Sequence, residues 1–281
     1  MTQIDFHLQL NHNDNWSMSR LHFHDYCEFL LPLTSPGNIF VNDQVYPLRR
    51  GTLYLIGENT LHRTIATGFH ARYVLHISRK ALSALSTPQT DFSRMAQSAF
   101  LRADMSNDQM ISLIERFQAL ERNKNDGAFG SDVHQAIALL DLLLQVAPIL
   151  DAATAGDAVR SKDFLRVSPI LDYIRDHLSE PLTLDLIAGH FYLSKHYLCR
   201  IFKSATGFSV MEYIIYSRVL KARQLLKEGV SVQQAGELSG FSDNSHFIRT
   251  FGHLTGTSPG RYAREHQGSD AAPILGGSLK E

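Results

Sequence analysis

An internal repeat near the C-terminus constrains the fold of this 281-residue chain more than any other feature. The stretch LCRIFKSATGFSVMEYI, from Leu198, matches FIRTFGHLTGTSPGRYA, from Phe247, at a constant offset of 49 residues. Upstream, at an offset of 48, Thr183 and Ser231 each open a short apolar helix. Each copy therefore predicts a helix, a turn and a second helix, the order of a helix-turn-helix unit. The coinciding pairs are Arg200 and Arg249, Phe202 and Phe251, Thr206 and Thr255, Gly207 and Gly256, Ser209 and Ser258, and Tyr213 and Tyr262.

Polar side chains occupy the outer face of each predicted second helix. Most are hydrogen-bond donors suited to base edges and phosphates, and acidic residues are nearly absent. Residues 209–229 predict one continuous helix, which could hold the two units roughly 34 Å apart, one turn of DNA. The alternative is a helical bundle with a duplicated hairpin and no DNA partner. The outer-face residues are Lys195, His196, Cys199, Arg200 and Lys203 in the first copy, and Asn244, Ser245, His246 and Arg249 in the second.

Charge is distributed unevenly along the chain. Residues 1–163 carry 14 Lys and Arg against 17 Asp and Glu, whereas residues 164–267 carry 12 against 9, with six histidines. The formal net charge of the whole chain is −1. A local basic excess of this size gives only weak support for DNA binding by itself.

Composition predicts a soluble globular protein with room for two domains. The longest apolar run, LLDLLLQVAPIL from Leu139, is interrupted by Asp141 and Gln145 and is too short to span a bilayer. The N-terminal MTQIDFHLQL lacks the basic start and apolar block of a secretory signal. Cys27 and Cys199 lie far apart, in different predicted domains. We therefore expect a cytoplasmic protein without a disulfide and without a membrane partner.

Short strand-like segments between residues 21 and 76 predict a small antiparallel barrel or sandwich. Helical periodicity follows, with Asn107 or Asp108 and Ser131 or Asp132 as expected N-caps. Small polar residues without a period then predict an interdomain linker. The predicted division is a β-barrel domain over 1–80, a helical segment over 81–150, a linker over 151–163, a helical domain over 164–267 and a flexible tail over 268–281.

The stretch LHFHDYCE, residues 21–28, has metal-ligand spacing. His22, His24 and Glu28 share parity, so they could project from one face of an extended segment. A returning strand hairpin would bring His62, which ends GTLYLIGENTLH, beside them. Three histidines and a carboxylate suit Zn, Ni, Mn or Fe, with one or two positions left for water or ligand. Cys27 has the opposite parity and is expected to face away from the cluster and pack.

Three interpretations of this cluster remain open. It could activate a substrate at a metal, as in an enzyme. It could hold a small effector, through a metal or through the bare polar groups, as in a sensor. It could also be a metal-free core in which the side chains hydrogen-bond to one another.

The C-terminal region, about 168–264, resembles the DNA-binding domain of the AraC/XylS family of transcription regulators. The residues that carry the resemblance are LTLDLIAGHFYLSKHYLCRIFKSATGFSVMEYI, SRVLKARQLL and GFSDNSHFIRTFGHLTGTSPGRY. It implies a sequence-specific regulator that binds an operator in double-stranded DNA and contacts RNA polymerase. The family's base-contacting positions fall on His196, Cys199 and Arg200 in the first unit and on Asn244, Ser245 and Arg249 in the second, with Lys203 as a further DNA contact.

The second unit departs from the family pattern. Ala235 and Gly236 stand where Ile and Ala are usual, which would weaken packing and helix propensity. Gly252 replaces a common basic residue, and the arginine usual after the last tyrosine is displaced to Arg264. We expect a second unit that is less stable or binds DNA more weakly.

The N-terminal motifs, His-x-His-x-x-x-Glu and Gly-x5-Gly-x4-His, resemble the two motifs of the cupin barrel, with Gly57 where the second motif often has Pro. The resemblance implies a cupin-like barrel with a divalent transition metal on His22, His24, Glu28 and His62. Many regulators of this family bind an effector in such a domain without a metal. A similar HxHDYxEF signature in sugar-responsive members implies a sugar or sugar-phosphate effector.

An apolar stripe in residues 133–150, formed by Val133, Ile137, Leu140 and Leu144, could pack on the barrel or form a dimer interface. The family resemblance favours a homodimer. The sequence thus predicts a multidomain α and β protein: a cupin-like β-barrel, a helical dimerisation segment and an all-α double helix-turn-helix. We expect a regulator and not an enzyme; the alternative is a metal-dependent cupin enzyme with an accessory DNA-binding domain.

Overall fold

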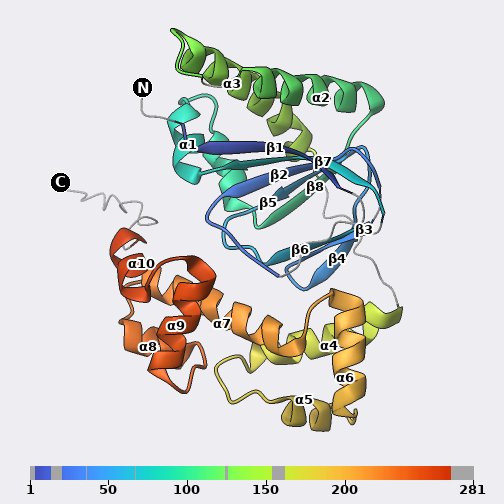
Figure 1. Ribbon diagram of the computed structural model, residues 1–281, viewed down its shortest axis with the longest axis vertical. Helices are drawn as coiled ribbons and strands as arrows, with labels where there is room; N and C mark the ends of the chain where they lie inside the picture. The colour runs from blue at the N-terminus through green and yellow to red at the C-terminus, as the bar shows by residue number, and fades with distance from the viewer. Residues whose placement is uncertain are drawn as a thin grey trace, which may run out of the picture. The chain divides into compact units, whose positions relative to one another are not determined.

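The computed structural model describes residues 4–13, 21–35, 37–66, 68–123, 126–153 and 162–266. These residues form two compact units, one within Met1–Ser168 and Ile201–Phe208, the other within Pro169–Arg200 and Ser209–Glu281. The N-terminal region is rich in strands and the C-terminal region is helical, as predicted (Figure 1). The predicted tail and most of the predicted linker lie outside the described residues.

The strands form two antiparallel sheets. All the observed pairings between named strands lie within one sheet or the other, so the described residues do not form a closed barrel. Strand β8 lies in a stretch for which the sequence predicted only helices, and it pairs with β5 at the sheet edge. The five-stranded sheet has the order β1 (Phe6–Asn13), β7 (His70–Ile77), β2 (Cys27–Pro32), β5 (Thr52–Ile56) and β8 (Phe100–Asp104). The three-stranded sheet has the order β4 (Gln44–Pro47), β3 (Gly37–Val41) and β6 (His62–Ala66).

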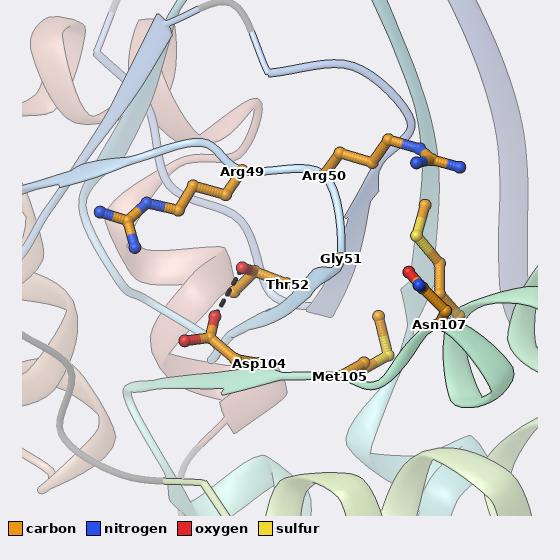
Figure 2. A pocket seen from close by; sticks show the side chains of 8 residues that line it. Arg49, Arg50, Gly51, Thr52, Asp104, Met105 and Asn107 are labelled. Atoms are coloured by element: carbon orange, nitrogen blue, oxygen red, sulfur yellow. Dashed lines mark hydrogen bonds between the residues drawn. The ribbon is translucent and has the colours of Figure 1, made fainter.

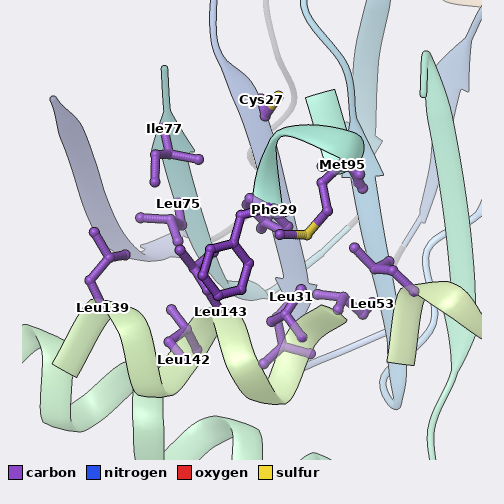
Figure 3. Packing of buried hydrophobic residues seen from close by; sticks show 14 of the residues in the cluster. Cys27, Phe29, Leu31, Leu53, Leu75, Ile77, Met95, Leu139, Leu142 and Leu143 are labelled. Carbon is purple, nitrogen blue, oxygen red and sulfur yellow. The ribbon is translucent and has the colours of Figure 1, made fainter. Parts of the chain in front are cut away.

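Alternation of side chains gives the five-stranded sheet two different faces. Cys27, Phe29 and Leu31 of β2 lie in the core cluster that packs against helices (Figure 3). Leu30, on the opposite face of the same strand, packs in a second cluster that includes Ile39 of the smaller sheet. The predicted orientation of Cys27 is therefore confirmed.

Helices follow the strands. Ser106 caps α2 by accepting a hydrogen bond from the Gln109 amide, and the Gln109 side chain accepts one from the Ser106 amide. Gly130 is the N-cap of α3 and has φ of 83°. A glycine adopts this left-handed conformation without strain. Both expected sets of N-caps were thus wrong by one residue. The helical elements are α1 (Arg79–Leu85), the 3-10 helix η1 (Phe92–Gln97), α2 (Asn107–Arg122) and α3 (Ser131–Asp151).

Helix α3 begins at Ser131, close to the start that the sequence predicted. The whole helix is long and apolar enough to cross a membrane by length and composition only, whereas the apolar run from Leu139 taken alone is too short. Leu142 and Leu143, however, are completely buried against the five-stranded sheet (Figure 3). This packing is that of a core helix in the β-rich unit.

The predicted apolar stripe divides between two environments. Leu140 is partly buried and packs against the core cluster. Val133, Ile137 and Leu144 are exposed by 44%, 57% and 55%, so these three side chains have little cover from their own unit. The stripe therefore does not simply pack on the sheet, as one interpretation expected.

The helical region contains the predicted repeat. Thr183 and Ser231 each cap a seven-residue helix by accepting a hydrogen bond from an amide three residues later. The second helix of each unit has twelve residues. The elements are α4 (Lys162–Asp176), α5 (Leu184–His190), α6 (Lys195–Thr206), α7 (Val210–Lys227), α8 (Val232–Leu238), α9 (Asn244–Thr255) and α10 (Pro259–His266).

The repeated threonine and glycine end the second helix of each unit. The Thr206 hydroxyl donates to the Phe202 carbonyl at 2.6 Å, and the Thr255 hydroxyl donates to the Phe251 carbonyl at 2.8 Å. The glycines that follow, Gly207 and Gly256, have φ of 84° and 73°. Sequence identity between the copies therefore marks positions that terminate a helix and start the next.

Candidate functional site

The four predicted metal ligands lie together. Each of His22, His24, Glu28 and His62 offers one ligand atom, and these atoms are within 4.8 Å of one another. The His22 and His62 backbones form an isolated bridge, in which the His22 amide donates to the His62 carbonyl at 3.1 Å. Glu28 belongs to β2 and His62 to β6, so both sheets contribute to the cluster.

The expected single extended segment is wrong, although the predicted cluster forms. Asp25 and Tyr26 form a bend, and β2 begins only at Cys27. His24 therefore reaches Glu28 through this bend and not through strand alternation. The bend places the Tyr26 carbonyl 2.9 Å from the His24 Nδ1 atom.

Backbone contacts fix the orientation of two imidazoles. His24 Nδ1 lies 2.9 Å from the Tyr26 carbonyl, and His62 Nδ1 lies 2.9 Å from the Thr60 carbonyl. Because a carbonyl only accepts hydrogen bonds, both Nδ1 atoms carry the proton. In a neutral ring, each Nε2 atom then has a lone pair directed toward Glu28.

The Nε2 atoms of His24 and His62 lie 3.1 Å and 3.5 Å from Glu28 Oε2. The His62 ring is completely buried, and its Nε2 atom has no hydrogen-bond partner of acceptable geometry among the described residues. Lone pairs of neutral rings that face a carboxylate oxygen are stabilised by a shared proton or by a cation. The donor set therefore fits a divalent metal ion.

Burial and hydrogen bonding control the charges of the cluster. Burial alone would raise the pKa of Glu28, but the neighbouring imidazole rings of His24, His62 and His76 hold it well below its usual range. Burial, with a contribution from His62, lowers the pKa of His22 to about 3. A carboxylate and a neutral His22 imidazole at neutral pH are the forms that bind metals.

His76 is a member of the cluster that the sequence did not predict. It lies on β7 directly opposite Glu28, and its Nε2 atom is 2.9 Å from Glu28 Oε2. Its ring is 27% exposed, whereas the side chain of Glu28 is 3% exposed. The alternation in ARYVLHI places His76 on one sheet face with Val74, but only the pairing of β2 with β7 brings it to Glu28.

The predicted DNA-contacting residues lie on the surface of α6 and α9. His196, Arg200 and Lys203 are exposed, and Cys199 is half-buried. The Arg200 guanidinium lies over the Tyr197 ring, 5.3 Å from its centroid. The first turn of neither helix contains an acidic residue. In α9, the residues Asn244, Ser245 and Arg249 are all exposed.

The opposite faces of both helices are buried. Leu198 and Phe202 of α6, like Phe247 and Phe251 of α9, have no exposed surface. Each helix therefore has an apolar inner face and a neutral or basic outer face, and the outer face is available for a phosphate backbone.

A separate pocket of about 310 Å³ lies at the edge of the five-stranded sheet (Figure 2). Thr52 donates to Asp104 at 2.6 Å in its wall. Arg49 and Arg50 line it, but Figure 2 shows that their side chains extend in opposite directions. The two guanidinium groups do not converge on one ligand position, and none of the predicted site residues lines this pocket.

A protein-family model described as a helix-turn-helix domain matches residues 187–265. The uncharacterized HTH-type transcriptional regulator YfiF of Bacillus subtilis is 27% identical over 247 residues, covering 86% of this chain and 78% of that protein. The HTH-type transcriptional activator RhaS of Salmonella arizonae is 26% identical over 257 residues, covering 90% of this chain and 89% of that protein.

Among solved structures, the DNA-binding domain of AdpA in complex with a target DNA is 27% identical. The match covers 35% of this chain and 90% of the AdpA chain, with a TM-score of 0.34.

Proposed function

We propose that this chain is a DNA-binding transcription regulator of the AraC/XylS type, and that a small effector bound in its β-rich unit controls its action on DNA. The alternative of a metal-dependent enzyme with an accessory DNA domain is not supported, because the curated relatives that match most of the chain are named as regulators. The observation that carries DNA binding is the repeated unit with a buried apolar face and an exposed face free of acidic residues in its first turn.

The β-rich unit is proposed to act as a cupin-like sensor that holds Zn, Ni, Mn or Fe. His22, His24, Glu28 and His62 would hold the ion, and the buried lone pair of His62 Nε2 supports this assignment. A bound ion would supply an electrophilic centre for oxygen atoms of an effector. The backbone carbonyls of Tyr26 and Thr60 fix the two imidazoles that face Glu28.

A sugar or sugar phosphate is the proposed effector. Sugar hydroxyls are oxygen donors, and a further hydrogen-bonding side chain, the buried Thr64, lies two residues from His62 in β6. The resemblance to sugar-responsive regulators supports the same class.

A homodimer is proposed to form through the exposed part of the α3 stripe. Val133, Ile137 and Leu144 follow one another at spacings of four and seven residues, which place them on one helix face, and all three are exposed. Two copies would present four helix-turn-helix units to repeated DNA half-sites. Contact with RNA polymerase and a cytoplasmic location complete the proposal.

Metal analysis and DNA footprinting test the proposed sensor. We expect the purified full chain to hold about one equivalent of a divalent metal through its four ligands. His62→Ala should lose it, because the ring supplies a buried ligand atom. His12→Ala is the matched control, since His12 lies on β1 and is exposed.

The footprint is then measured for metal-loaded and chelated protein, with and without candidate sugars and sugar phosphates. A footprint that responds to a sugar only in metal-loaded protein supports the whole proposal. If no metal binds but a sugar still alters the footprint, the sensor is metal-free. A footprint that none of these conditions changes contradicts effector control in this unit.

A further inference from the structure

His76 contacts the predicted metal ligands without being one of them. Its Nε2 atom lies 2.9 Å from Glu28 Oε2, the shortest contact that this oxygen makes with the three histidines. The group of ligand atoms within 4.8 Å of one another contains His22, His24, Glu28 and His62, but not His76.

The hydrogen-bond partners of the ring nitrogens distinguish His76 from His24 and His62. The Nδ1 protons of His24 and His62 are donated to backbone carbonyls, so their Nε2 atoms have lone pairs. His76 Nε2 faces a carboxylate oxygen at hydrogen-bond distance, 2.9 Å from Glu28 Oε2. His76 can therefore donate a hydrogen bond to Glu28 while His24 and His62 offer lone pairs to an ion.

We propose that His76 is a positioning residue that holds the Glu28 carboxylate in place for metal binding. This inference rests on the proposed metal site and names a residue that supports it from a neighbouring strand. Because Glu28 and His76 are paired in register, the sheet itself fixes the distance between them. A partner that orients a metal ligand in this way contributes to affinity, and its loss weakens metal binding about 10-fold to 100-fold.

The test compares three variants of the full chain. His76→Gln retains an N–H donor of similar reach, whereas His76→Phe keeps a ring but removes the donor. His7→Phe is the matched control: His7 is paired with His76 across β1 and β7, is exposed, and bonds to Gln9.

Two readouts separate positioning from packing. Dissociation constants for Zn²⁺ and Co²⁺ are measured by competition with a chromophoric chelator, and the visible absorption of bound Co²⁺ reports its ligand geometry. We expect His76→Phe to raise both constants about 10-fold to 100-fold and to change the Co²⁺ spectrum. His76→Gln should restore the spectrum and most of the affinity, and His7→Phe should match the wild type.

The outcomes distinguish this inference from the proposed metal site. A wild-type chain that binds neither Zn²⁺ nor Co²⁺ overturns the metal site and the role of His76 with it. Wild-type binding with unchanged constants and spectrum in His76→Phe overturns the role of His76 alone. Equal losses in His76→Phe and His76→Gln assign it to packing and also overturn the inference. Thermal unfolding without metal checks each fold, and His76→Leu replaces His76→Phe if that variant does not fold.

Discussion

The two helix-turn-helix units have the same backbone plan but different side chains at corresponding buried positions. Their first helices have seven residues and their second helices twelve. Corresponding turn contacts also recur: the Leu193 amide donates to the Ala188 carbonyl at 2.8 Å, and the Phe241 amide donates to the Gly236 carbonyl at 3.0 Å.

Compared with the first copy, the second copy has smaller buried side chains on its first helix and a larger one on its second helix. Three corresponding buried positions hold Ile187, Ala188 and Leu198 in the first unit and Ala235, Gly236 and Phe247 in the second. A Cβ atom on Gly236 would lie only 2.8 Å from the Phe247 ring. The packing defect expected at Gly236 is therefore wrong, because the larger ring fills the space beside it. The lower helix propensity of glycine at this position remains.

We expect substitutions in the turns of the two helix-turn-helix units to differ most in their effect on the free energy of unfolding. Gly240 and Tyr192 occupy corresponding positions, and both have positive φ, 95° and 55°. A Cβ atom on Gly240 would lie 2.3 Å from the Leu178 carbonyl oxygen, whereas Tyr192 is 97% exposed. Gly240→Ala should lower the free energy of unfolding by about 3 kcal/mol, from backbone strain and overpacking together.

Denaturant unfolding followed by circular dichroism measures this effect. Tyr192→Gly is the matched variant, and it should change stability by less than about 1 kcal/mol, because relief of strain offsets the added chain entropy. A Gly240→Ala variant as stable as the wild type would show that the second turn tolerates a side chain as the first one does.

The arginines of the two second helices test whether both units read DNA equally. Arg200→Ala should weaken binding to the preferred operator by about 2 kcal/mol and relax base specificity at one position. Arg249→Ala should cost less, because the second unit has Gly252 where the first has Lys203. Binding to a randomised operator library measures both quantities. A greater loss in Arg249→Ala would make the second unit the stronger reader.

Local patterns predicted the helical region well. The repeat identifies chain positions with specific backbone tasks, such as Thr206 and Gly207 at a helix end, and these tasks depend on neighbours within a few residues. The boundaries of α5, α6, α8 and α9 follow directly from such signals. The N-caps of α2 and α3 were wrong by one residue, because Asn, Asp and Ser inside the first turn resemble caps.

The candidate metal site was only partly predictable. The spacing of His22, His24, Glu28 and His62 marks them as a set, but the bend at Asp25 was not evident from it. His76 could not be identified without the pairing of β2 with β7, which depends on the order of strands distant in sequence. Contacts between neighbouring strands carry no local signal in a single sequence.

The close packing of Gly236 in α8 against the Phe247 ring in α9 can be tested directly. Gly236→Ala should destabilise the protein by about 1 kcal/mol, because the clash with the Phe247 ring exceeds the gain in helix propensity. Adding Phe247→Leu recreates the small-residue pairing of Ala188 with Leu198 and should recover part of the loss. Unfolding of the two single variants and the double variant forms the required cycle. Strictly additive effects would show that these two residues are not coupled.

The smallest expected effect concerns a basic residue that only the first unit retains. Gly252 corresponds to the exposed Lys203, and a Cβ atom there would have its nearest neighbour at 3.9 Å, so the helix has room for a side chain. Gly252→Lys should strengthen DNA binding by less than about 1 kcal/mol at physiological salt and steepen the dependence of log K on log salt by about one. Lys203→Ala should reduce the slope by a similar amount, and Gly252→Ala separates the charge from improved helix propensity. If Gly252→Ala strengthens DNA binding as much as Gly252→Lys, the gain from a lysine at this position comes from helix stability and not from a phosphate contact.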